Sequence, residues 1–102
     1  MNLANFKLIT IICEPVLKSI VLNLARENGA TGFTVTEVTG EGNGENNSGE
    51  HLETKLKIEI IAAPALASKL SQAVADRFFG HYSLITYSLD ISVLRPEKFE
   101  TS

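Results

Sequence analysis

The sequence LETKLKIEII occupies residues 52–61, and hydrophobic and polar side chains alternate along most of it. In an extended chain one face would carry Leu52, Thr54, Leu56, Ile58 and Ile60. The opposite face would carry the charged residues Glu53, Lys55, Lys57 and Glu59. A repeat of two residues is typical of a strand with one buried side, the kind found mainly in antiparallel sheets. The stretch therefore predicts an antiparallel sheet that is covered on one side.

Three other stretches predict strands, and two predict helices. The strands are expected at residues 6–13, 31–39 and 82–94, where β-branched and other hydrophobic residues are dense. Segments with hydrophobic residues at helical spacing follow Pro15 and Pro64, and proline fits the first turn of a helix. The resulting βαββαβ order predicts an α+β, ferredoxin-like sandwich, in which two helices cover one face of a four-stranded antiparallel sheet.

Several details of these elements are specific enough to check. The first helix is expected to bury a stripe formed by Leu17, Ile20, Val21 and Leu24. Gly29 is expected to end this helix in the left-handed conformation. In the last strand, Asp90 is expected to form an ion pair with Lys55 or Lys57 across neighbouring strands.

Length and composition predict one mildly acidic domain spanning residues 1–102. The chain has 102 residues, 44% hydrophobic content and a formal net charge of −3, without the basic block that nucleic-acid binding favours. No hydrophobic run approaches the roughly 20 residues needed to span a bilayer, and the N-terminus lacks a signal-peptide layout. We therefore expect a cytoplasmic protein with no direct membrane insertion. The lone cysteine, Cys13, is expected to be an inert core thiol.

Residues 40–50 contain glycine, asparagine and glutamate and almost no hydrophobic side chain, so we expect a flexible loop at about residues 40–51. Its alternating Gly40, Gly42 and Gly44 would let backbone amides converge on a phosphate, although a plain hairpin loop fits the composition equally well. The chain shows no nucleophile–base pair and no recognisable set of metal ligands. Neither an enzyme nor a metal site is therefore expected.

The stretch GATGFTVTEVTGEG at residues 29–42 resembles the G-A-x-G-[YF]-T-V…G-x-G signature of PII-like signalling proteins. The predicted strands and helices follow that family's order along nearly the whole chain. The likeness is greatest to the carbon-associated branch, which includes the SbtB proteins of cyanobacteria and the carboxysome-associated PII-like proteins. The cysteine pair that ends many SbtB proteins is absent, which favours the carboxysome-associated group.

This resemblance implies a homotrimer that binds an adenine nucleotide in clefts between subunits. Matching positions place ligand contacts at Thr36, Glu37, Val38, Thr39, Gly40, Gly42, Ser83, Leu84, Ile85 and Arg95. The partner-binding T-loop of the family corresponds here to Glu41, Asn43, Gly44, Glu45, Asn46, Asn47 and Ser48. The polar tail begins at about residue 95 and runs to residue 102.

Two departures from the family pattern affect the expected ligand. Glu41 replaces a lysine, and Leu84 replaces a glycine that lies against the nucleotide. Residues 40–50 contain no arginine or lysine, so we expect ADP or AMP rather than ATP, with Arg77 a candidate additional cation.

The sequence thus predicts a regulatory protein that senses ADP or AMP, with bicarbonate a candidate second ligand. Its partner is implied by the resemblance to be a bicarbonate transporter in inorganic-carbon uptake. The alternative is a trimeric scaffold of the same fold that has lost nucleotide binding.

Overall fold

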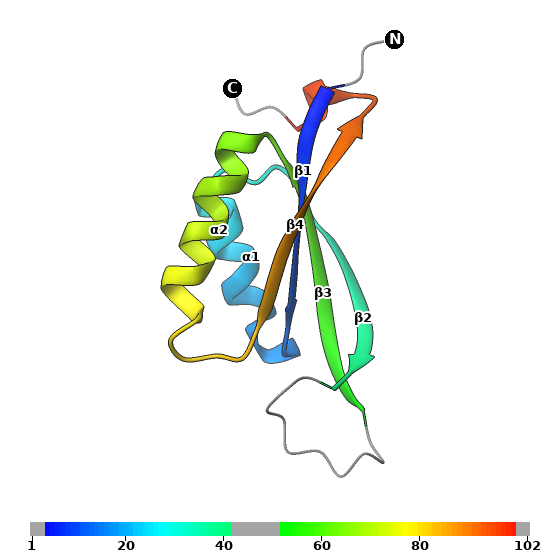
Figure 1. The fold of residues 1–102 in the computed structure, drawn as a ribbon. Coiled ribbons are helices and arrows are strands. Elements are labelled where there is room, and N and C mark those ends of the chain that lie inside the picture. Colours follow the sequence, from blue (N-terminus) through cyan, green and yellow to red (C-terminus); the bar gives the residue numbers. More distant parts are fainter. Residues whose placement is uncertain (1–3, 42–51, 100–102) are drawn as a thin grey trace.

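The computed structural model describes residues 4–41 and 52–99. Its strands in this part of the chain are β1 (Ala4–Cys13), β2 (Thr34–Gly40), β3 (Glu53–Ala62) and β4 (Ile85–Val93). Its helices there are α1 (Lys18–Glu27) and α2 (Pro64–Phe78), with short 3-10 turns η1 (Pro15–Leu17) and η2 (Pro96–Lys98). Both helices lie on the same side of the sheet (Figure 1). The predicted ferredoxin-like α+β sandwich is confirmed.

The strand order in the sheet is β2-β3-β1-β4, and every neighbouring pair is antiparallel. The two central strands are β1 and β3, so β2 and β4 form the two edges of the sheet. Asp90 on β4 consequently pairs with Lys7 on β1, its direct cross-strand neighbour. The predicted pairing of Asp90 with Lys55 or Lys57 is wrong, because β1 separates β4 from the strand that carries those lysines.

The core lies between the central strands and the helices. Its largest buried side chains come from β1, β3, α1 and α2, and they include Ile9, Ile11, Ile58, Ile60, Val21, Leu70, Val74 and Phe78. Leu56, Ile58 and Ile60 of β3 are buried at alternate positions, as the sequence predicts. Leu52 and Thr54, at the start of the same stretch, are exposed, and Lys55 on the other face is buried. Fully burying such a side chain contributes about 1.5–3 kcal/mol each, which is why this layer dominates the stability of the fold.

The helix and strand ends differ from the predicted ones at a few residues. Residues Pro15–Leu17 form a 3-10 turn, and the inward face of α1 is centred on Val21 and Ala25. Ile20 lies about 100° around the helix from Val21 and is exposed, so its predicted burial is wrong. Tyr82 is predicted to begin the last strand but lies outside β4, because its backbone amide donates to the carbonyl of Phe78 and extends the turn after α2.

Gly29 ends α1 with φ of 99°, as predicted, and a side chain there would strain the backbone. Gly29→Ala should lower the free energy of unfolding by about 1–2 kcal/mol, the usual cost of a left-handed conformation for an L-residue. Urea unfolding at one protein concentration would measure the change. The matched control is Gly32→Ala, because a Cβ atom at Gly32 meets nothing within 4 Å and should change stability by less than about 1 kcal/mol. Equal losses in the two variants would contradict the assignment.

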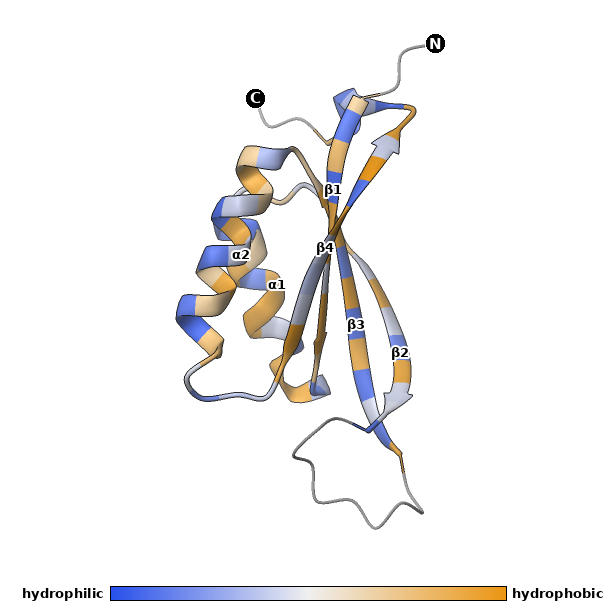
Figure 2. Ribbon diagram, viewed as in Figure 1, coloured by the Kyte–Doolittle hydropathy of each residue, from blue (hydrophilic) through white to orange (hydrophobic). Residues whose placement is uncertain are grey.

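The side of the sheet away from the helices, here called the open face, is apolar along β4. Ile9 points toward the helices, and its cross-strand partner Ser88 shares that side. The alternating residues Ile85, Tyr87 and Leu89 therefore belong to the open face, and each is exposed in the single chain. Figure 2 shows the hydrophobic residues along this strand. An exposed apolar face of this kind favours burial against another protein surface.

No helix in residues 4–41 or 52–99 is long and apolar enough to cross a bilayer.

Candidate functional site

A hollow of about 480 Å³ lies at the end of the β2–β3 hairpin. It is lined by Glu37, Val38 and Thr39 of β2 and by Thr54 of β3. Thr39 lies directly opposite Thr54 in the ladder, and Gly40 forms the next rung. Three of the predicted ligand residues thus share one hollow, and Thr36 and Gly40 continue the same strand on either side of them.

The predicted residues Ser83, Leu84 and Ile85 lie at the same end of the sheet but at its other edge. Ile85 pairs with Ile12 near the end of β1, where Cys13 pairs with Leu56 of β3. Strands β3 and β1 separate β2 from β4, a span of about 14 Å at ~4.8 Å per strand. Within one chain these two groups of residues therefore do not form a common site.

Arg95 follows β4 at the opposite end of the sheet, where Val93 pairs with Ala4. The segment after Arg95 packs there, because the Phe99 ring contacts the Phe6 ring at a centroid distance of 5.9 Å. Within one chain Arg95 is consequently remote from the hollow. The predicted cation Arg77 is exposed on α2.

The predicted loop contacts fall mostly outside the described residues. The predicted residues that lie outside are Gly42, Asn43, Gly44, Glu45, Asn46, Asn47 and Ser48. Glu41 is described, and it is exposed directly after β2.

The hairpin register places two lysines beside the strand that carries the predicted ligand residues. Sequence reasoning did not assign these lysines to the site. Lys57 lies opposite Thr36, and Lys55 lies opposite Val38. Opposed residues share a face, and Leu56 and Ile58, which alternate with the two lysines along β3, are buried toward the helices. Both lysines therefore project on the open face. The sequence shows both lysines as charged positions of the alternating strand. Which residues of β2 they face depends on the register of the hairpin.

The Lys55 residue is only 8% exposed, which is rare for lysine unless its charge is compensated. Its ammonium group lies 3.5 Å from a carboxylate oxygen of Glu53, two residues earlier on the same strand. The Lys55 charge also acts on Cys13, the neighbour of Leu56 in the ladder. Burial raises the pKa of the buried Cys13 thiol, the Glu14 carboxylate adds to this rise, and the Lys55 ammonium partly offsets it. Cys13 is a free, buried thiol, so the predicted place in the core is confirmed.

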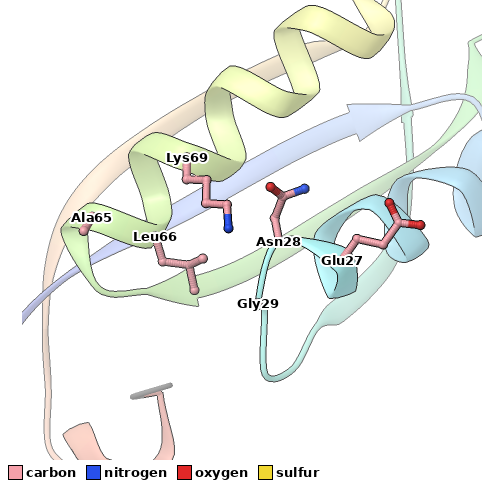
Figure 3. Close-up of a pocket in the computed structure, with 6 residues that line it drawn as sticks. All are labelled: Glu27, Asn28, Gly29, Ala65, Leu66 and Lys69. Atoms are coloured by element: carbon pink, nitrogen blue, oxygen red, sulfur yellow. The ribbon is translucent and has the colours of Figure 1, made fainter. Parts of the chain in front are cut away.

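A second hollow of about 370 Å³ lies between the end of α1 and the start of α2 (Figure 3). Glu27, Asn28 and Gly29 line one side, and Ala65, Leu66 and Lys69 line the other. The Asn28 side-chain amide donates to the carbonyl of Leu24 at 2.9 Å and so closes the end of α1. One carboxylate and one ammonium group give this lining no net charge. The β2–β3 end is the better candidate for an anionic ligand because Lys55 and Lys57 lie beside the predicted ligand strand. Neither lysine is among the described residues that line the first hollow, which include the carboxylate of Glu37.

Solved structures resemble this chain over almost its entire length. A PII-like signalling protein of Thermus thermophilus is 30% identical, with a TM-score of 0.83 over 98% of this chain and 100% of that chain. The CPII protein of Thiomonas intermedia, bound to ADP, AMP and acetate, is 26% identical, with a TM-score of 0.81 over 97% and 98% of the two chains. Its complex with ADP and bicarbonate gives 25% identity and a TM-score of 0.82 over the same shares.

Among curated proteins, none matches the chain significantly. The sequence profile of the family described as nitrogen regulatory protein P-II matches residues 6–98. This match covers all of the strands and helices described above except the first two residues of β1. The chain therefore belongs to the P-II family.

Proposed function

We propose that this chain is a regulatory rather than a catalytic protein, which binds an adenine nucleotide in clefts between the subunits of a homotrimer. ADP or AMP is the favoured ligand, and bicarbonate is a candidate second ligand. The segment at residues 40–51 carries the signal to a protein partner. In the carbon-associated branch, that partner would be a bicarbonate transporter acting in inorganic-carbon uptake, and the protein would work in the cytoplasm.

The observation that carries this proposal is the pair of lysines beside the predicted ligand strand. Phosphate oxygens need cationic or amide donors, and the predicted loop supplies no arginine or lysine. Lys55 and Lys57 face the same side as Val38 and Thr36, so cations lie beside the strand that carries the predicted ligand residues. The complexes of the Thiomonas protein with ADP, AMP and bicarbonate support the choice of ligand class.

The separation of the predicted site into two parts supports a cleft between subunits. Residues 36–40 and 83–85 lie at one end of the sheet but at opposite edges. If the β2 edge of one subunit approaches the β4 edge of the next, the two parts meet, and repetition of that contact around an axis closes a ring. The apolar open face of β4 would be covered in such a ring.

The test is a calorimetric titration of the protein with AMP, ADP and ATP, with and without bicarbonate. AMP and ADP should bind at least about five-fold more tightly than ATP, because the third phosphate adds repulsion from acidic residues such as Glu41, worth about 1 kcal/mol. Equal or tighter binding of ATP would contradict this order. An intact trimer that binds no adenine nucleotide below about millimolar concentration would favour the scaffold alternative.

A further inference from the structure

We propose that Glu53 is an internal competitor for the anionic ligand of Lys55 and so sets the ligand affinity of this site. This inference rests on the proposed function, because it assigns Lys55 to a nucleotide phosphate. The inference gives the Glu53 carboxylate a role that opposes ligand binding. Neither the family match nor the ligands of the related structures assign such a role.

The first step of the argument is the geometry of the pair. Glu53 begins β3 and lies two residues before Lys55, so the two side chains leave the strand on the same face. Their charged groups are 3.5 Å apart. The Lys55 side chain is 10% exposed and the Glu53 side chain is 52% exposed. The lysine is thus held against the protein, whereas the glutamate is free to turn into water.

The second step concerns what an incoming phosphate meets at this place. In the observed arrangement the Lys55 charge is already compensated by Glu53. A phosphate that binds Lys55 must either displace this carboxylate or accept its repulsion. Displacement is feasible because Glu53 is more than half exposed and its carboxylate can be hydrated by water. Binding is therefore weaker than at an uncompensated lysine, by about the strength of the existing ion pair.

The third step is the position of Glu53 at the root of the predicted loop. Glu53 pairs with Gly40, the last residue of β2, in the final rung of the described ladder. The displaced carboxylate therefore moves at the point where the hairpin enters the predicted partner-binding segment. A ligand that displaces Glu53 would change the charge distribution at that point, which is how local ion-pair changes act as switches in proteins.

The test is Glu53→Gln, which keeps the size of the side chain and removes its charge. AMP and ADP should bind about five-fold more tightly to this variant, since an ion pair of this partial exposure is worth about 1 kcal/mol. Isothermal titration calorimetry at low salt measures the change, and raising the salt concentration should reduce it. The matched control is Glu27→Gln in the second hollow, which makes the same change in net charge and should leave the affinity unchanged.

The outcomes separate this inference from the proposed function. If the unmodified protein binds AMP or ADP and Glu53→Gln binds it no more tightly, Glu53 does not compete and the inference is wrong. Equal gains in Glu53→Gln and Glu27→Gln would show a general charge effect, which also overturns it. If neither the unmodified protein nor Glu53→Gln binds a nucleotide while both remain folded by circular dichroism, the proposed function itself fails.

Discussion

Leu89→Asp should convert the trimer that we propose into a folded monomer. Leu89 lies opposite Leu8 on the open face of the sheet and is 55% exposed in the single chain. If that face is the interface between subunits, the substitution puts one unpaired carboxylate per subunit into an apolar contact. Each such buried charge costs several kcal/mol, and the ring repeats the cost three times. Gel filtration with light scattering would measure the mass, and circular dichroism would report the fold.

The fold of the subunit should survive this change because Leu89 points away from the helices. The core is formed by the other side of the sheet, which includes Ile9 and Ile11 of β1. The matched control is Val16→Asp, a comparable apolar-to-acidic change at a residue that is 77% exposed on η1. This control should remain trimeric. A folded Leu89→Asp variant that keeps the mass of the unmodified protein would show that the open face is not the interface.

The monomer would also test the division of the ligand site between subunits. Thr36 to Gly40 and Ser83 to Ile85 lie at opposite edges of one sheet, so a single chain presents only one part to a given ligand. Nucleotide affinity should therefore fall together with the trimer in Leu89→Asp and stay unchanged in Val16→Asp. A monomer with full affinity would place the whole site within one chain.

The local sequence pattern predicted most of the fold, because burial and strand period are local properties. The alternation of Leu56, Ile58 and Ile60 predicted the buried side of β3 correctly. The local pattern was wrong about the burial of Ile20 in α1, which follows a 3-10 turn. It was also wrong about Tyr82 as a strand residue, because a backbone hydrogen bond extends the preceding turn through it. Such departures at the ends of elements depend on a few backbone hydrogen bonds that periodicity does not reveal.

The relation between strands was harder to predict, because it depends on register rather than on local pattern. The sequence of β4 shows that Ile85, Tyr87 and Leu89 share one face, but only their pairing with β1 shows that this face is turned from the helices. The same reason explains why Lys55 was not assigned to the site. Its position opposite Val38 follows from the hairpin ladder, across a segment whose length alone does not determine the register.

Lys55→Met should weaken the binding of AMP and ADP by about 10- to 100-fold. Methionine keeps an unbranched apolar chain of similar length, so the buried stem of Lys55 remains filled and only the ammonium group is lost. A hydrogen bond to a charged group contributes about 1.5–3 kcal/mol, which sets the size of the expected loss. Titration calorimetry measures it. The matched control is Lys69→Met, which removes a lysine from the second hollow and should bind as the unmodified protein does.

The double variant Lys55→Met with Glu53→Gln separates the two ways in which Lys55 can act. Lys55→Met alone leaves the Glu53 carboxylate without its 3.5 Å partner, so part of the lost affinity comes from repulsion. The double variant removes both charges together and restores the net charge of the pair. If Lys55 binds the phosphate directly, affinity recovers only partly and stays below that of the unmodified protein. If Lys55 serves only to neutralise Glu53, affinity recovers completely, and the phosphate must be held by other groups.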